Sequence, residues 1–510
     1  MRIVRVCIYK HNNVYDSLSD ILVKAGNDVT YLVLPMDHEL TTIGTKLSKV
    51  ITLEYSPETL EYSEQMGELK SSLWVKDFSN PTKILALSRL FKNFARSTLK
   101  HVLANETLIE LIKAEKFDLG VTESFDMSAF GLFKVFDIPA HVSMFAGGLF
   151  SSHYKYFGMT YPVSQVPTLH ASFADTEMTF VSRFKNFISF WAIDMFTSFN
   201  LDNLQDIFNQ KYGNGFVDIP DQVRKSSFHI SNADPYLDFT TPAIAKIVQL
   251  GGFSIPKPNL LDKKWSDILN KRKRNVLVSF GTNCKSTDMP LPIRNAFLET
   301  FAKFPDVTFI WKYESAKDGT AKDLPNVFLS EWLPQTDILA DSRLSGFVTH
   351  GGLNSISEAA HTGTKVLVIP LFADQYRNSK IAEKIGFGTI LKKEDIVPHK
   401  LSAALRKLLE DESELTRNAQ RIGEMIKNRP YNTTELFIKH IEFASKFKQL
   451  PHLNMESHDT YFFQYLMLDV IGAILLALIL ILSLITLCIC TMYKKCCRKT
   501  NIVSDPKKHD

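Results

Sequence analysis

Short apolar runs alternate with amphipathic stretches along the first half of the chain. The runs have the length of strands, and the stretches between them carry apolar residues at helical spacing. The predicted strands span residues 3–9, 29–34, 117–121 and 138–144, and the predicted helices span residues 14–25 and 127–136. Strands separated by helices indicate a parallel sheet with crossover helices.

The second half repeats this alternation after a break at residues 251–258, where glycines and prolines predict a domain boundary. The predicted strands span residues 275–280, 307–311, 327–329, 346–350 and 365–370, and the predicted helices span residues 293–304 and 376–385. Residues 398–447 have an amphipathic helical pattern, and we expect them to pack back across the two domains. The predicted fold class is α/β, with two doubly wound Rossmann-like domains, residues 1–250 and 251–450, that face a cleft.

An uncharged apolar run at residues 470–492 is long enough for a helix to cross a bilayer. The tail that follows it, residues 493–510, is rich in lysine, whereas the preceding segment, residues 451–469, carries Asp469 and several aromatic residues. The positive-inside rule places such a tail in the cytosol and the large domains in a lumen. We therefore expect a single-pass type I membrane protein.

Three further features concern localisation. Lys507 and Lys508, near the C-terminus, resemble the dilysine signal of endoplasmic reticulum membrane proteins. Asn105 and Asn432 begin Asn-x-Thr sequons, which predict a glycoprotein. The apolar run at residues 1–9 is too short for a signal peptide and reads as a strand, so we expect the N-terminal part to be incomplete.

Residues 179–199 form an aromatic-rich helical pattern that allows two interpretations. A helix of the core or of an acceptor pocket is the plainer one. The alternative is a helix on the membrane surface that helps to collect apolar acceptors. The sequence leaves both open.

The composition excludes several classes of protein. With 59 basic and 55 acidic residues the chain has no electrostatic footprint for nucleic acid. Of six cysteines, only Cys7 and Cys284 precede the apolar segment, so no disulfide framework is expected. The cysteine and histidine spacings match no zinc site and Asp-x-Asp does not occur, so we expect neither a metal nor another cofactor.

The clearest chemical pattern follows the strand predicted to end at His350. Gly351 and Gly352 come next, and a helix is expected to begin near Asn354. The glycines allow a ligand to approach the backbone, and the free amides at the helix start favour an anion, so the turn predicts a phosphate site. Neither a P-loop nor the dinucleotide fingerprint is present.

Other polar residues are expected at the same sheet edge. They are Ser279 and Gly281, Trp332 and Gln335, Ser355 and Glu358, and Asp374 and Gln375. The indole and amide of the second pair suit a nucleobase, and the carboxylate and amide of the last pair suit sugar hydroxyls. Ser355 and Glu358 also have the spacing of a capping box, which is a purely structural alternative.

In order and spacing these residues resemble the signature of the UDP-glycosyltransferase family, which includes the UDP-glucuronosyltransferases. The likeness covers most of the chain, including the membrane stop and the basic tail, and it implies a GT-B type fold with a UDP-sugar as co-substrate. The implied contacts are Trp332 with uracil, Gln335 with the base or ribose, Glu358 with the ribose hydroxyls, His350 and the following amides with the diphosphate, and Asp374 and Gln375 with the donor sugar.

The resemblance also implies a catalytic base. His11 follows the first predicted strand, and residues 26–29, Gly-Asn-Asp-Val, lie downstream as in the family pattern. It would accept a proton from the acceptor hydroxyl while UDP leaves and the anomeric configuration inverts. The family pairs this base with an aspartate, whereas this chain has Glu123 there and Asp126 three residues on. The turn before His11 is also shorter than in the family.

We therefore expect an inverting glycosyltransferase that moves a hexose or glucuronic acid from a UDP-sugar to a hydroxyl of a small lipophilic acceptor. Glucose, glucuronic acid and galactose stay open as donor sugars, and so does homo-oligomerisation. Glu123 and the short turn motivate an alternative, a catalytically weak member that binds UDP-sugars or lipophilic ligands. A non-enzymatic type I membrane receptor is a further alternative. The polar residues at the strand ends of the second half argue against it.

Overall fold

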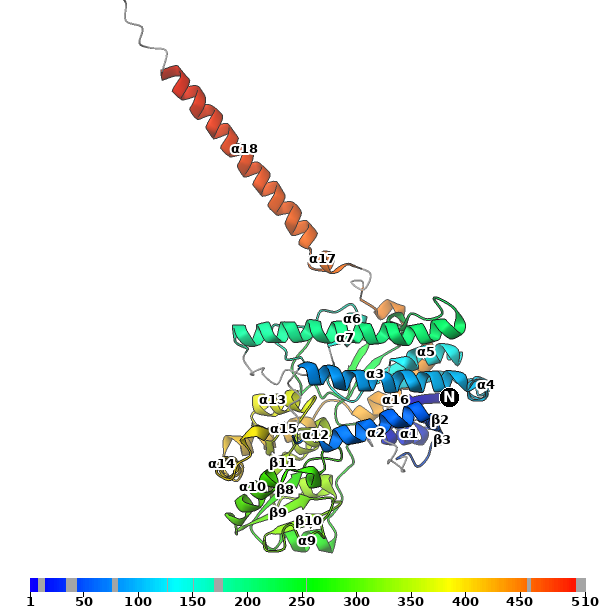
Figure 1. Ribbon diagram of the computed structural model, residues 1–510, viewed down its shortest axis with the longest axis vertical. Coiled ribbons are helices and arrows are strands. Elements are labelled where there is room, and N and C mark those ends of the chain that lie inside the picture. The colour runs from blue at the N-terminus through cyan, green and yellow to red at the C-terminus, as the bar shows by residue number, and fades with distance from the viewer. Residues whose placement is uncertain are drawn as a thin grey trace, which may run out of the picture. The chain divides into compact units, whose positions relative to one another are not determined.

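The computed structural model describes residues 1–7, 14–33, 44–75, 81–125, 127–149, 151–168, 178–253, 255–455 and 460–500. The chain divides into two compact units, Met1–Asn454 and Met455–Asp510. The first unit contains two parallel sheets with helices on both faces, as the alternating pattern predicts (Figure 1).

The first sheet has seven parallel strands in the order β3-β2-β1-β4-β5-β6-β7. The strands are β1 (Arg2–Cys7), β2 (Asp28–Val33), β3 (Lys49–Thr52), β4 (Leu119–Glu123), β5 (His141–Phe145), β6 (His229–Ser231) and β7 (Ile247–Gln249). The helices of this part are α1 (Val14–Lys24), α2 (Pro57–Ser71), α3 (Pro81–Ala104), α4 (Glu106–Ala114), α5 (Ser128–Val135), α6 (Ser151–Tyr156), α7 (Phe180–Tyr212) and α8 (Ile219–Arg224). The strand order reverses between β1 and β4, which pair with Val6 opposite Thr122.

The second sheet has six parallel strands in the order β10-β9-β8-β11-β12-β13. The strands are β8 (Arg274–Ser279), β9 (Val307–Lys312), β10 (Val327–Ser330), β11 (Leu344–Thr349), β12 (Val366–Val368) and β13 (Gly388–Ile390). Its helices are α9 (Lys263–Leu269), α10 (Leu291–Ala302), α11 (Gln335–Leu339), α12 (Leu353–Thr362), α13 (Gln375–Ile385), α14 (Pro398–Leu408) and α15 (Glu414–Lys427).

Both faces of each sheet are buried, which explains why the strands read as continuous apolar runs. In β1, Val4 and Val6 join one core and Ile3 joins the core on the other face. In β8, Val276 and Leu277 divide in the same way between the two cores of the second sheet. Side chains alternate across a strand, so two covered faces require apolar residues at every position.

The last helix of this unit, α16 (Thr433–Phe447), returns to the first sheet. Phe437, Ile441 and Ala444 lie in the same core as Ile3 of β1. The amphipathic region 398–447 therefore contains three helices, and its final one packs back on the first half of the chain, as expected from the sequence.

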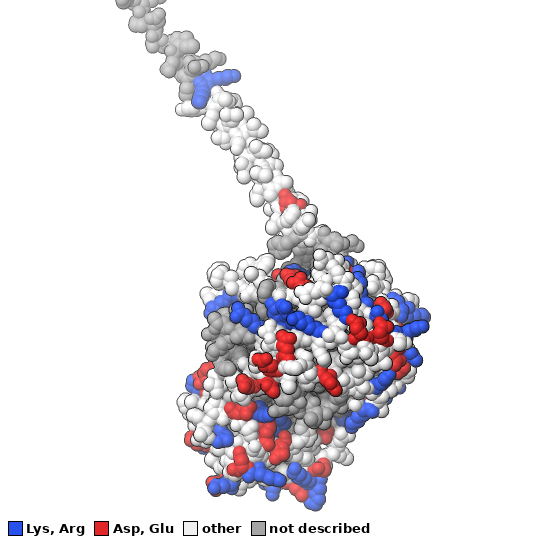
Figure 2. Space-filling model, turned by 45° about the vertical axis from the view of Figure 1, so that its right-hand side comes forward, with Lys and Arg blue, Asp and Glu red and all other residues white. Residues whose placement is uncertain are grey.

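The second unit consists mainly of α18 (Leu468–Thr500), which follows the single turn α17 (Phe462–Tyr465). The stretch Leu468–Cys496 is long and apolar enough to cross a membrane, and none of its most apolar window is buried against protein. No charged side chain interrupts the helix between Asp469 and Lys494 (Figure 2). One C-terminal apolar helix of this kind fits a single transmembrane span. Lys507 and Lys508 lie outside the described residues.

Candidate functional site

The carboxyl ends of β8 and β11 lie side by side where the second sheet changes its strand order. Thr349, the last residue of β11, lies opposite Ser279, the last residue of β8. Open α/β sheets bind ligands at such a point, because the loops that follow the two strands run in opposite directions. Ser279 itself is buried, so the turn after it provides the accessible groups.

The imidazole of His350 occupies the space between two glycines. A Cβ atom at Gly281 would lie 2.8 Å from Cε1 of His350, and one at Gly352 would lie 2.6 Å from Nε2. Gly351, between them in the turn, has a φ of 85°, and a Cβ there would lie 2.7 Å from Cγ1 of Val368. The glycines therefore allow the turns after β8 and β11 to close on the ring.

His350 is uncharged near neutral pH. Burial lowers its pKa to about 4, and the ammonium group of Lys312 acts in the same direction. A neutral imidazole can donate one hydrogen bond to a phosphate but contributes no positive charge.

Lys312, at the end of β9, places a positive charge near His350. Its Nζ donates to the carbonyl oxygen of Gly281 at 2.7 Å and to Oε1 of Glu314 at 3.2 Å. The lysine thus stabilises the turn that contacts His350, and its buried ammonium group is paired with Glu314. Sequence reasoning missed this residue, although a lysine that ends an otherwise apolar strand was a usable signal.

Helix α12 begins directly after the glycines and has no side-chain cap. Gly352 is the N-cap residue, so the capping-box alternative for Ser355 and Glu358 is wrong. Both residues instead accept hydrogen bonds from Nε2 of Gln335, at 3.2 and 2.7 Å. Burial raises the pKa of Glu358, and the hydrogen bond from Gln335 opposes this. Asn354 is half-buried in the first turn of the helix.

The segment before α11 presents Trp332. This side chain is 68% exposed, whereas the next residue, Leu333, is buried. Oγ of Ser330 donates to the carbonyl oxygen of Trp332 at 2.6 Å and fixes the turn. The indole ring is accessible at the surface.

Asp374 and Gln375 lie at the start of α13. Nδ2 of Asn378, one turn on, donates to Oδ2 of Asp374 at 2.9 Å and to the carbonyl oxygen of Gly351 at 3.1 Å. Asn378, which sequence reasoning missed, therefore joins the carboxylate to the glycine turn. Burial raises the pKa of Asp374. The Oε1 atom of Gln375 accepts from the backbone of Leu371 at 2.8 Å, so this end of the side chain holds the turn.

The acceptor side is described only in part. His11 and Asp126 lie outside the described residues. Glu123 is half-buried at the end of β4, and its Oε1 accepts from the backbone N–H of Ala146 at 3.4 Å. Because β1 and β4 are parallel neighbours, their carboxyl ends, and Glu123 with them, lie at the same edge of the sheet.

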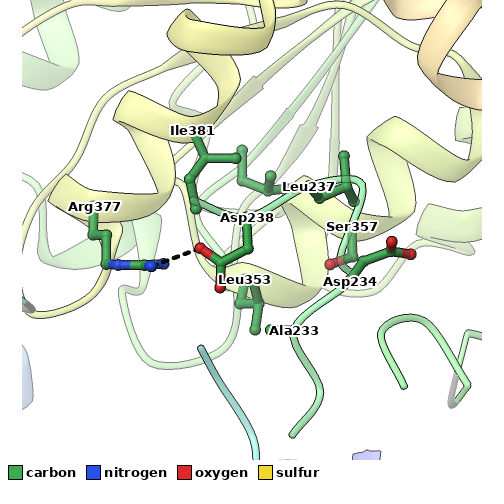
Figure 3. A pocket seen from close by; sticks show the side chains of 9 residues that line it. Ala233, Asp234, Leu237, Asp238, Leu353, Ser357, Arg377 and Ile381 are labelled. Atoms are coloured by element: carbon green, nitrogen blue, oxygen red, sulfur yellow. Dashed lines mark ion pairs between the residues drawn. The ribbon is translucent and has the colours of Figure 1, made fainter. Parts of the chain in front are cut away.

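Two contacts join the halves of the unit beside the second sheet's edge. Trp74, just after α2, is buried against Phe280 with ring centroids 4.9 Å apart, and its Nε1 donates to the carbonyl oxygen of Lys285 at 2.9 Å. Arg377 on α13 forms a buried ion pair of 2.6 Å with Asp238, which follows β6 (Figure 3). Both contacts hold a loop of the first half against an element of the second.

A small pocket lies beside this ion pair. It is lined by the loop Ala233–Asp238 and by residues of α12 and α13, among them Leu353 and Ser357 (Figure 3). Within the described ranges, no group of three or more His, Cys, Asp or Glu side chains could hold a metal ion.

The model of the family described as UDP-glucoronosyl and UDP-glucosyl transferase matches residues 9–502. The chain belongs to this family. Human UDP-glucuronosyltransferase 1A8 is 26% identical over 496 residues, which cover 96% of this chain and 91% of the relative. A Caenorhabditis elegans protein, ugt-47, provisionally named a UDP-glucuronosyltransferase, is 28% identical over 89% of this chain and 85% of its own length.

Solved structures share the fold of this UDP-glycosyltransferase. The kitacinnamycin glycotransferase superposes with a TM-score of 0.59 and 17% identity, over 86% of this chain and 99% of that one. The glycosyltransferase VinC, crystallised with DTDP, has a TM-score of 0.55 and 16% identity, over 88% of this chain and 100% of its own. The architecture is GT-B, as the resemblance implies.

Proposed function

We propose that this UDP-glycosyltransferase moves a hexose or glucuronic acid from a UDP-sugar to a hydroxyl of a small lipophilic acceptor, with inversion at the anomeric carbon. The main support for the proposal is a pair of hydrogen bonds from Gln335 to Ser355 and Glu358. Both acceptors lie on α12, the helix that begins directly after the His350 turn. A free helix start followed one turn later by a half-buried carboxylate offers sites for a diphosphate and for the ribose next to it.

In this proposal uracil stacks on Trp332, the ribose hydroxyls donate to Glu358, and the diphosphate accepts from the amides at the start of α12. The exposed indole ring is available for stacking. The donor sugar contacts Asp374, and from Gln375 only the Nε2 group would reach it, because the amide oxygen holds the preceding turn.

The acceptor reaction is assigned to His11 with Glu123. The acceptor O–H passes its proton to the imidazole, the oxygen attacks the anomeric carbon, and the bond to the UDP oxygen breaks with its electron pair. Glu123 would orient the imidazole and stabilise its positive charge, in the place of the family's aspartate. Proton NMR of the product reports the anomeric configuration, and retention would contradict this mechanism.

No metal is needed in this proposal. The leaving diphosphate would be stabilised by the amides of α12 and the nearby cation of Lys312, which are in place before the reaction. Activity that persists after chelation with EDTA is the expected result, and activity restored by an added divalent cation would refute it.

We place the enzyme in the endoplasmic reticulum membrane with luminal domains. The two sequon asparagines are exposed helix N-caps, and their Oδ1 atoms accept from Leu108 and Thr434 at 3.0 Å. A glycan attached to Nδ2 leaves these caps intact. Protection of the domains from protease in sealed microsomes, and a mobility shift on deglycosylation, are expected.

The decisive experiment measures UDP release by microsomes that contain the full chain. UDP-glucose, UDP-glucuronic acid and UDP-galactose are offered with a panel of phenols and sterols, and His11→Ala is compared with His399→Ala, a change at an exposed position of α14. We expect activity that is lost in the first variant and kept in the second. Equal activity in both would remove His11 as the base.

Silence with every donor, despite binding of UDP, would instead support the catalytically weak member. The substitution of Glu123 for the family's aspartate is the observation that motivates this outcome. A Glu123→Asp variant that gained activity would confirm that the longer side chain is the cause.

A further inference from the structure

The N-terminal half of α7 presents a continuous apolar stripe to the outside of the first unit. Its exposed large side chains are Phe180, Val181, Phe184, Phe187, Ile188, Trp191 and Met195. Their spacing of three, four and seven residues puts them on one helical face. Phe180 and Met195, at the two ends of the stripe, are 74% and 71% exposed.

Contacts on the opposite face of α7 fix the orientation in which the helix exposes this stripe. Asn186, fully buried, donates from Nδ2 to the carbonyl oxygens of Val163 and Val166 at 2.7 and 2.9 Å, and its Oδ1 accepts from the N–H of Thr168 at 2.9 Å. Further along α7, Phe208 enters the core of the first sheet. The interpretation of the whole pattern 179–199 as a core helix is therefore wrong for the stripe.

The stripe is as large as the largest apolar patch of a typical monomer. The four aromatic side chains of the stripe, with roughly 150–250 Å² of surface each and about half exposed, present about 300–500 Å², and Val181, Ile188 and Met195 add to this area. The largest patch of a typical monomer has about 300–600 Å². Such a patch indicates an apolar partner.

Charges beside the stripe suit a lipid surface. Arg183 and Lys185 are exposed on either side of it. The one acidic residue between positions 180 and 195, Asp194, is paired with Lys155 at 3.1 Å. An aromatic face flanked by cations is typical of helices that lie in the interface of a membrane with anionic lipids.

We propose that residues 180–195 of α7 lie in the headgroup region of the bilayer that the apolar helix α18 crosses. The linker 455–467 can span at most about 45 Å when extended, so the first unit is tethered to the bilayer and even a weak contact with lipid is populated.

Tryptophan quenching tests the proposal, because α18 contains no tryptophan and every tryptophan of the chain belongs to the first unit. The full chain is reconstituted in vesicles of phosphatidylcholine and phosphatidylserine, with or without brominated phosphatidylcholine. Trp191 is the tryptophan of the stripe, and Trp332 is the other exposed one. Trp191→Phe and Trp332→Phe form a matched pair.

We expect brominated lipid to cause a partial loss of emission that disappears in Trp191→Phe and persists in Trp332→Phe. Replacing Phe184 and Ile188 by serine, with Trp191 retained, should reduce the loss, and an unchanged thermal transition would show that these variants fold. Equal quenching of wild type and Trp191→Phe overturns the proposal. So does the absence of quenching, including the case in which cross-linking shows that a second copy covers the stripe.

Discussion

Alanine substitutions at three glycines separate backbone strain from steric clash at the His350 ring. Gly26, after α1, has a φ of 89° and open space where a Cβ would lie. Gly352 has an ordinary φ of −59°, but its Cβ would lie 2.6 Å from Nε2 of His350. Gly281 combines both conditions, with a φ of 80° and a Cβ 2.8 Å from Cε1 of the same ring.

The expected losses of unfolding free energy follow from these conditions. A left-handed backbone at a residue with a Cβ costs about 1–2 kcal/mol, which is the whole effect at Gly26. Forcing a methyl group into a filled space costs about 1–3 kcal/mol, which is the whole effect at Gly352. Gly281→Ala should combine the two, at about 2–5 kcal/mol. The ring cannot avoid both glycines, because its tip lies between them.

Thermal unfolding of the full chain in detergent micelles, with and without UDP, is the assay. The transition temperature should fall least for Gly26→Ala and most for Gly281→Ala. Stabilisation by UDP should persist in Gly26→Ala and decrease in the other two, since both displace His350. A Gly352→Ala variant as stable as wild type would show that the ring does not fill this space. Equal losses at Gly26 and Gly281 would attribute everything to the backbone.

Three further experiments test ionisable side chains that are wholly or partly buried. Glu358→Gln should weaken UDP-sugar binding roughly 10- to 100-fold, because a charged hydrogen-bond acceptor is lost, and should leave the transition temperature unchanged or higher, because burial raises the pKa of this carboxyl. Calorimetry measures the affinity and thermal unfolding the stability, and a loss of both affinity and stability would contradict the role of Glu358 in binding the donor. Asp238→Asn should lower the free energy of unfolding by about 3–5 kcal/mol, because it leaves Arg377 buried and unpaired. Adding Arg377→Met should recover part of this loss, and additive effects of the two substitutions in urea unfolding would refute the coupling. Burial lowers the pKa of His153 from 6.5 to about 3, so its contribution to stability is present above pH 6.5 and is lost as the pH falls from there. Between pH 6.5 and 4, the urea midpoint of His153→Gln should therefore fall less steeply than that of wild type. Parallel curves would exclude this histidine as a cause of the acid destabilisation.

The sequence predicts five of the six strands of the second sheet, all except β13, because strands covered on both faces read as continuous apolar runs. The predicted strand 275–280 and helix 376–385 correspond to β8 and α13 within one residue at each end. In the first half, the region between positions 34 and 117 received no prediction, yet it contains β3 and the helices α2 to α4. A three-residue strand such as β6 is too short to show any periodicity.

Residue types at the donor edge were predictable, but their hydrogen-bond partners were not. The turn motifs place His350 and Glu358 by local sequence alone. Trp74, in contrast, contacts Lys285 across 211 positions of the chain. Asn378 becomes informative only when its amide is seen between Asp374 and the glycine turn. No local pattern carries such contacts, because they depend on how the two halves pack.

The donor edge is built from charged groups that the protein alone satisfies only in part. Burial raises the pKa values of both Glu358 and Asp374, and the principal side-chain donor to each is a neutral amide, from Gln335 and Asn378. The same burial that makes these carboxylates costly strengthens any hydrogen bond that a ligand hydroxyl donates to them. The desolvation of the two carboxylates thus lowers the stability of the enzyme without ligand and raises its affinity for a polyhydroxylated donor. Neither the loss of stability nor the gain in affinity can be inferred before the burial of the two side chains is known.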